Sequence, residues 1–277
     1  MKAFWTKQNI HTEKKDWRNL AESLNQSKIT NLQNLNFTSN EILIIEKLNY
    51  RNMITAHLEK LLNISENDHG YVGNNSLKWA NNVITNELYS DIDIQSFNTQ
   101  FDRYQLFKYC SNSDKSDLNV ITAILSWGGM RINNVRDLFK NINALYPLVN
   151  ALRNKIFNSR QSAFKAFKKE RELGKLPKLG IGYFTKLICF LSPELNGYIM
   201  DQWAGKSLNL LAGNEIVKIR NNWVVNDNND VTYEIFCSYI DSLAKKLNCT
   251  GIEAEKRIFS VGGRNKGEWR KYLINNY

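Results

Sequence analysis

The stretch LPKLGIGYFTKLICF, residues 176–190, places two glycines in a short basic turn and then continues as an apolar segment. Upstream, 159–173 (SRQSAFKAFKKEREL) carries apolar residues along one side at helical spacing, and Gly174 follows as a typical helix stop. Downstream, apolar residues recur at the same spacing from about Tyr183. The pattern predicts two helices joined by a glycine turn, with Lys186 on the edge that points away from the apolar face.

Similar periodicity extends along the rest of the chain. Apolar residues recur every three or four positions in DWRNLAESL (16–24), NEILIIEKL (40–48), MITAHLEKLL (53–62), DLNVITAIL (117–125) and FCSYIDSLAKKL (236–247). Only three prolines are present, and few segments alternate as strands do. The sequence therefore predicts an all-α protein. One stretch, NNWVVNDNNDVTYEIF (221–236), is compatible with either a short β-hairpin or a loop between helices.

The composition limits the class of partner. The 277 residues carry a net charge of +10, and 43% of them are hydrophobic, which is enough to build a core. An excess of basic residues favours a polyanionic partner, with nucleic acid ahead of an anionic membrane. The alternative is that the lysines form only a solvated surface.

Cysteine and histidine usage argues against several other classes. Cys110, Cys189, Cys237 and Cys249 are scattered without a Cys-x-x-Cys pair, and the three histidines lie far apart. We therefore expect no zinc site, no iron–sulfur cluster and no disulfide framework. The N-terminus lacks the apolar core of a signal peptide, and no apolar run reaches the length of about 18 residues that a membrane span needs. The protein is expected to be soluble and cytoplasmic.

The glycine turn has two interpretations. Small residues let another chain approach the backbone, and the free N–H groups that open the second helix can hold a phosphate. Lys175 and Lys178 in the turn, beside Gly180 and Gly182, suit that task. Many helical hairpins use such turns for packing alone, so the turn by itself leaves both interpretations open.

A second polar residue opens the next helix. Asp201, in NGYIMDQWAGKSLNLL (196–211), lies 15 residues after Lys186 and precedes an apolar helical pattern. Aspartate is a favoured N-cap, so a structural role is sufficient to explain it. A lysine early in one helix and an aspartate at the start of the next can also face each other across a cleft.

These residues carry a resemblance to a known family. LGIGYFTK followed by IMDQW resembles the helix-hairpin-helix DNA glycosylases, in particular the 8-oxoguanine DNA glycosylase branch with a lysine–aspartate pair. Lys186 corresponds to the catalytic lysine and Asp201 to the aspartate, which in the superfamily follows some 18 to 20 residues later. Here the spacing is shorter, and the glycines are displaced: Gly182 fits the first of the usual pair and Phe184 replaces the second.

A second segment resembles the same superfamily. AILSWGGMRINNVRDLF (123–139) is similar to the region whose loop inserts into the DNA duplex. On that resemblance Trp127, Gly128 and Gly129 occupy the wedge, and Arg131 falls where an arginine reads the orphaned partner base. The residue types suit the task, because an aromatic ring stacks where a base has left and arginine reaches base edges or phosphate. A buried tryptophan in a capping turn is the structural alternative.

The resemblance implies a fold and a reaction. The fold is all-α, with two helical lobes and the hairpin at the cleft: an N-terminal helical region (1–100), a central lobe (101–192) and a C-terminal region carrying Asp201 (193–277). The reaction is excision of a damaged or modified base from double-stranded DNA by a monomer. A neutral Lys186 attacks the sugar and forms a Schiff base, β-elimination cleaves the strand, and no metal or cofactor is required.

The sequence offers only weak candidates for recognition of the base. Four aromatic residues, each with a core role as the alternative, are candidates for a base pocket: Phe190, Trp203, Trp223 and Phe259. The basic, glycine-containing FSVGGRNKGEWRKY (259–272) either touches DNA or is a solvated tail. Two other functions stay open: a DNA-binding module without catalysis, and a glycosylase-fold hydrolase of free modified nucleosides.

Overall fold

The computed structural model describes residues 53–64, 71–84, 88, 92–97, 100–262 and 266–277. The described residues from Ala56 to Tyr277 belong to one compact unit. The helices predicted at 16–24 and 40–48 lie outside the described residues, so the N-terminal helical region predicted over 1–100 is described only in part. The boundary predicted between residues 192 and 193 stays a prediction.

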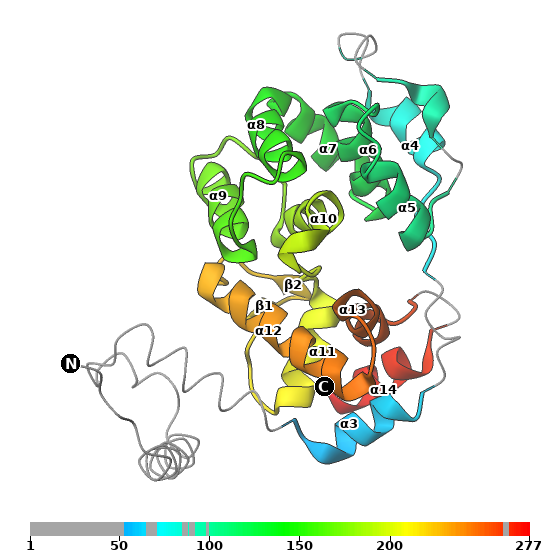
Figure 1. The fold of residues 1–277 in the computed structure, drawn as a ribbon, viewed down its shortest axis with the longest axis vertical. Helices are drawn as coiled ribbons and strands as arrows, with labels where there is room; N and C mark the ends of the chain where they lie inside the picture. Colours follow the sequence, from blue (N-terminus) through cyan, green and yellow to red (C-terminus); the bar gives the residue numbers. More distant parts are fainter. Residues whose placement is uncertain (1–52, 65–70, 85–87, 89–91, 98–99, 263–265) are drawn as a thin grey trace, which may run out of the picture. The chain divides into compact units, whose positions relative to one another are not determined.

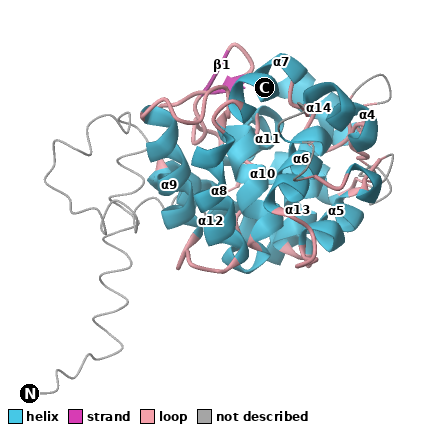
Figure 2. Ribbon diagram, turned by 90° about the horizontal axis from the view of Figure 1, so that it is seen from above, coloured by secondary structure: helices cyan, strands magenta, loops and turns pink. Residues whose placement is uncertain are grey.

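Helices form most of the described chain, as Figure 2 shows, and the prediction of an all-α protein is confirmed. In chain order the α-helices are α3 (Thr55–Leu62), α4 (Ser76–Val83), α5 (Arg103–Cys110), α6 (Asp117–Trp127), α7 (Ile132–Phe139), α8 (Ile142–Arg153), α9 (Arg160–Glu172), α10 (Ile181–Leu191), α11 (Gln202–Ala212), α12 (Asp230–Leu247), α13 (Gly251–Phe259) and α14 (Glu268–Asn276). The shorter elements are the 3-10 helices η4 (Ile94–Ser96) and η5 (Pro193–Leu195) and the strands β1 (Ile219–Arg220) and β2 (Trp223–Val224).

The stretch that left a hairpin or a loop open contains a hairpin. β1 and β2 pair antiparallel on either side of Asn221 and Asn222. These two residues have φ of 51° and 63°, in the left-handed region that asparagine adopts more readily than most residues and that tight hairpin turns require. The short β-hairpin is therefore confirmed, and α12 follows it.

The two helices predicted around the glycine turn are confirmed. α9 starts after Ser159, whose side chain forms a capping box with Ser162, and Gly174 after its end has φ of 73°. That conformation is one that glycine adopts at helix ends without a steric penalty. α10 then starts after Gly180, its N-cap. The chain thus folds back on itself as a helical hairpin.

α10 lies among the helices that surround it, as Figure 1 shows. It contacts α5, α6, α8 and α9, and every residue from Phe184 to Leu191 is buried. The expectation that Lys186 points away from the core is wrong, because its side chain is buried with its neighbours. Helical spacing places Lys186 on a polar edge, but in this helix other helices cover that edge as well.

A network centred on Arg160 joins α9 to α12. The guanidinium donates to both carboxylate oxygens of Glu234, to Asp241 and to Ser238 on α12. It also donates to the carbonyl of Asn196, in the segment that leads to α11. All five N–H donors of this buried arginine are therefore used.

Candidate active site

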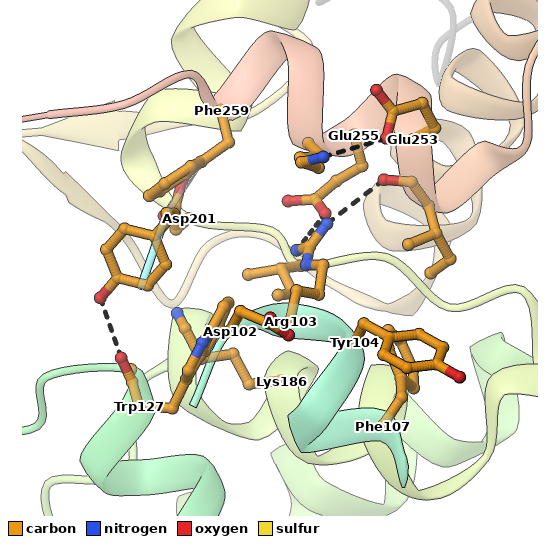
Figure 3. A pocket seen from close by; sticks show the side chains of 15 residues that line it. Asp102, Arg103, Tyr104, Phe107, Trp127, Lys186, Asp201, Glu253, Glu255 and Phe259 are labelled. Carbon is orange, nitrogen blue, oxygen red and sulfur yellow. Dashed lines mark hydrogen bonds and ion pairs between the residues drawn. The ribbon is translucent and has the colours of Figure 1, made fainter. Parts of the chain in front are cut away.

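A cavity of about 470 Å³ opens where α5, α6, α10, α13 and the start of α11 meet. That volume lies within the range of small-molecule sites, about 300–1,000 Å³. Figure 3 shows Lys186 and Asp201 at this cavity, with Arg103 and Glu255 beside them. These four residues come from four different segments of the chain, so the fold brings them together.

Lys186 has a buried amine. The residue is 7% exposed, and Nζ donates to the carbonyl of Gly182 at 2.9 Å and lies 5.4 Å from the ring centre of Tyr183. Burial lowers the pKa of Lys186 below the ordinary lysine value, although Asp201 and Glu255 oppose the shift. A lowered pKa increases the fraction of neutral amine, which is the form that acts as a nucleophile.

Gly128 makes room for the lysine side chain. A Cβ at this position would lie 2.8 Å from Cδ and 3.0 Å from Cε of Lys186. Gly128 is the C-cap of α6, so the end of that helix packs directly against the lysine stem. The structure thus gives Gly128, predicted to admit DNA, a role in packing against Lys186.

Asp201 is the N-cap of α11. Its Oδ1 accepts the backbone N–H groups of Trp203 at 2.8 Å and Ala204 at 2.9 Å. Among the residues that the structure describes, it forms no ion pair with Lys186, whose amine bonds to Gly182 instead. The predicted capping role is therefore present, and the carboxylate also lines the cavity.

Gly182 explains the short spacing between the lysine and the aspartate. It lies 19 residues before Asp201, within the superfamily spacing, and a Cβ on it would lie 3.4 Å from Cβ of Asp201. Lys186 follows one helical turn later on the same face. Because helical side chains lean toward the N-terminus, its amine reaches back over that turn to the Gly182 carbonyl. The Lys186 amine therefore reaches the turn of α10 that packs against Asp201, although the residue itself lies one turn further along the helix.

The buried pair Arg103–Glu255 lines the same cavity and was not predicted. Glu255 is fully buried, and one of its oxygens pairs with Arg103, which also donates to the carbonyl of Ile252 at 3.2 Å. Oε1 of Glu255 has no hydrogen-bond partner among the residues that the structure describes. Burial raises the pKa of Glu255, and Arg103 opposes the shift. The sequence held no signal for this pair, because each residue looks like an ordinary charged residue of a surface helix.

Trp127 lies in the cavity wall. It is 4% exposed and makes edge contacts with Tyr71 and Phe190, each at 5.0 Å between ring centres. The hydroxyl of Tyr71, which also was not predicted, donates to the Trp127 carbonyl at 2.9 Å. The predicted wedge role of Trp127 is not supported, because the ring is packed inside the protein; the buried alternative holds for it.

The rest of the predicted wedge loop is on the surface. Gly129 has φ of 69° and is exposed, as is Arg131, the N-cap of α7. Positive φ at Gly129 favours glycine, so this residue serves the turn itself. The role of Arg131 in reading a partner base stays a prediction.

Of the four aromatic residues predicted for a base pocket, one lines the cavity and three do not. Phe259 lines the cavity and contacts the Tyr71 ring at 5.5 Å. Phe190 does not line it, because it lies behind Trp127 against Phe107. Trp203 and Trp223 are also absent from its lining.

The glycine turn has a basic surface whose phosphate grip stays a prediction. Lys175 and Lys178 are both exposed, and Lys175 pairs with Glu170 at 2.9 Å. Lys178 has φ of 62°, a conformation that disfavours side chains other than glycine and asparagine. Gly180 is the N-cap of α10, so its turn presents backbone N–H groups at that helix start.

The described part of the chain contains no group of three or more His, Cys, Asp and Glu side chains placed to hold a metal ion. Its helices also include none long and apolar enough to span a bilayer.

The helical fold and the cavity lined by Lys186 and Asp201 agree with the resemblance to the DNA glycosylases. Residues 72–259 match the family described as "Putative 8-oxoguanine DNA glycosylase OGG-like protein", and the chain belongs to this family. The match covers the hairpin, Asp201, Glu255 and every residue that lines the cavity except Tyr71. No curated protein and no solved structure matches the chain. The family match supports a DNA glycosylase-like function, with DNA as the substrate.

Proposed function

We propose that the protein is a DNA N-glycosylase with abasic (β-elimination) lyase activity, which excises a damaged or modified base such as 8-oxoguanine through a Schiff base on Lys186. The observation that carries the proposal is a buried lysine amine in a cavity that Asp201 also lines. A module that only binds DNA gains nothing from a buried lysine, and burying a cation costs free energy because it is removed from water.

The reaction follows from the two side chains. The target nucleotide is extruded from the duplex, and the neutral amine of Lys186 attacks C1′ of its sugar. As the new C–N bond forms, the glycosidic bond breaks, and the base leaves with the bonding electrons and takes up a proton. The carboxylate of Asp201 stabilises the positive charge that develops on the sugar. Its capping bonds hold it in place for this task.

Strand cleavage continues from the same intermediate. When the sugar ring opens, the nitrogen lone pair forms the C1′=N bond of a protonated imine, and O4′ takes the electrons of the broken C1′–O4′ bond and a proton from water. Loss of a proton from C2′ then expels the 3′ phosphate by β-elimination. Hydrolysis of the imine releases Lys186, so the enzyme needs no further reactant than water.

The cavity supplies polar groups suited to a base. Within the described part of the chain, Oε1 of Glu255 is a buried acceptor without a partner, and Nε1 of Trp127 is a buried donor without one. Leaving such groups unpaired costs free energy, and a base that hydrogen-bonds to them recovers it. Phe259 and Tyr71 add apolar ring surface to the same cavity. We place the extruded base between these groups, and we expect the enzyme to act as a monomer on DNA in the cytoplasm.

Borohydride trapping tests the proposal. A duplex carrying 8-oxoguanine is incubated with the protein and borohydride, which reduces the imine to a stable covalent complex. We expect the wild-type protein to give the complex and Lys186→Gln to give none. Lys140→Gln is the control, because Lys140 is an exposed lysine paired with Asp137, and we expect it to give the complex. Thermal unfolding checks that Lys186→Gln is folded.

The other outcomes separate the alternatives. Trapping that persists in Lys186→Gln shows that another residue is the nucleophile. Steeply salt-dependent DNA binding without base release from a panel of modified duplexes indicates a binding module. Release of base from free modified nucleosides, unaffected by duplex DNA, indicates a nucleoside hydrolase.

A further inference from the structure

The cations of this protein differ in whether a carboxylate accompanies them. Lysines at several surface sites have acidic partners: Lys140 with Asp137, Lys168 with Glu172 and Lys256 with Glu253. Two cations near the cavity, Lys206 and Arg270, form no ion pair with any described carboxylate. An uncompensated pair of cations held in one place is a candidate receptor for an anion.

Lys206 is held in a fixed position on α11. Its Nζ lies 5.0 Å from the ring centre of Trp203 and 5.6 Å from that of Tyr277. It also donates to Oδ1 of Asn222, at the tip of the β1–β2 hairpin, at 2.7 Å. A lysine is normally a mobile side chain with large rotamer entropy, and contacts from three segments restrict this one. Its acceptor is a neutral amide, so the charge stays available.

The guanidinium of Arg270 is a second cation that packs against the indole ring of Trp203. It is 3% exposed, and its Cζ lies 3.8 Å from the ring centre of Trp203. Its Nη2 donates to the carbonyls of Phe259 and Ser260 at the end of α13. Nε is buried without a partner, so these two bonds do not satisfy the guanidinium among the described residues. Burial lowers the pKa of Arg270 to about 10.

The cluster lies beside the catalytic carboxylate. Asp201 caps the helix that carries Trp203 and Lys206, and Arg270 also contacts the ring of Phe259, which lines the cavity, at 5.1 Å. A sugar whose C1′ faces Lys186 and Asp201 has its phosphates next to it along the strand. Trp203 is two residues from Asp201 on the same helix, which makes it a candidate position for a backbone phosphate of the strand that carries the extruded nucleotide.

We infer that Lys206, supported by Arg270 on Trp203 and by Asn222, binds one phosphate of the DNA strand that carries the target base. This inference rests on the proposed function, because it takes the DNA strand as the ligand. It gives the C-terminal segment FSVGGRNKGEWRKY a contribution to DNA binding through Arg270. It also gives the β1–β2 hairpin a role, since Asn222 at its tip orients the lysine.

The test measures DNA affinity against salt concentration. In the Lys186→Gln background, fluorescence anisotropy reports binding to a lesion duplex for three further variants: Lys206→Ala, Lys206→Arg and Lys140→Ala. We expect Lys206→Ala to bind about tenfold more weakly, the effect of losing one charge-assisted hydrogen bond. Its slope of log affinity against log salt should fall by about 1. Lys206→Arg keeps the charge and is expected to keep the slope, and Lys140→Ala removes a compensated cation and should change neither quantity.

A neutral methylphosphonate placed at each linkage in turn identifies the phosphate. We expect one linkage near the lesion at which the substitution weakens binding of the Lys206 protein about tenfold but does not weaken binding of Lys206→Ala. If Lys206→Ala and Lys140→Ala bind alike, or if the loss is the same at every linkage, the inference is wrong. Trapping by the wild type in that case leaves the proposed function intact, whereas a protein that binds no duplex contradicts both.

Discussion

At the scale of single residues, Lys186 illustrates how burial changes chemistry. The chain has 24 other lysines, but the amine of Lys186 lies in a cavity beside Asp201 and Glu255. Two opposing effects act on it: burial lowers its pKa, and the two carboxylates raise it. Burial is the larger effect, so the amine loses its proton more readily than an exposed lysine does.

The pH dependence of strand cleavage follows from this balance. Single-turnover cleavage of an abasic duplex, which leaves base recognition out, should rise with pH as Lys186 deprotonates and level off below the ordinary lysine pKa. Glu255→Gln removes an anion that stabilises the protonated amine, so it lowers the pKa of Lys186 further. We expect the rising limb to move to lower pH.

Glu215→Gln is the matched control for that shift. Glu215 makes the same kind of ion pair, with Arg220, but is exposed and absent from the cavity lining. Its profile should coincide with that of the wild type. A limb that stays in place or moves to higher pH in Glu255→Gln contradicts the assignment of the limb to Lys186.

At the scale of elements, α11 depends on the residue that also serves the chemistry. Asp201 satisfies two backbone N–H groups at the start of the helix, and a negative charge there also interacts favourably with the helix dipole. One carboxylate therefore has both the capping role and the proposed catalytic role. Substitution by asparagine separates the two roles, because asparagine caps helices as well as aspartate does but has no negative charge.

Two substitutions at Asp201 measure the two roles. Asp201→Ala should lower the free energy of unfolding by about 1 kcal/mol, the usual cost of losing an N-cap. Asp201→Asn should leave the stability within about 0.5 kcal/mol of the wild type, since the cap persists. Both variants should release base about 100-fold more slowly, because the charge facing the sugar is gone. Urea denaturation and single-turnover kinetics give the two quantities, and full activity in Asp201→Asn would remove the carboxylate from the mechanism.

At the scale of the whole molecule, the site depends on how distant segments are joined. Arg160 is an example, because it links α9 to α12 and to the carbonyl of Asn196, ahead of Asp201. Glu234 and Asp241 are partly exposed, so water can hydrate them when the arginine is removed. The cost of breaking this network is consequently smaller than that of a fully buried ion pair.

Arg160→Met tests the contribution of this network. We expect the free energy of unfolding to fall by about 2–3 kcal/mol, because several charge-assisted hydrogen bonds are lost and two like charges remain close together. Lys140→Met, which breaks an exposed pair on α7, should change it by less than about 0.5 kcal/mol. Equal effects in the two variants would show that the Arg160 network adds no more stability than a surface pair.

Much of the fold and part of the site could be predicted from the sequence. The all-α class, α9, the glycine turn, the start of α10 and the cap at Asp201 are local features, set by contacts between residues a few positions apart. The Lys186–Asp201 assignment followed from the resemblance of the residues near the turn to the DNA glycosylases. The burial of Lys186 was not predictable, because it depends on α5, α6, α8 and α9 all covering α10.

The amino-acid sequence by itself determined several of the helices and the glycine turn, because caps, turns and periodicity act within one or two helical turns. Its resemblance to the DNA glycosylases pointed to Lys186 and Asp201 as the two residues at the centre of the proposed chemistry. Only the tertiary structure decided that Trp127 lies in a cavity wall and that Arg103 meets α13, whose Ile252 is 149 residues away. It also decided that Lys206 and Arg270 share one indole. These arrangements depend on packing between distant segments, and no local pattern records which segments come together.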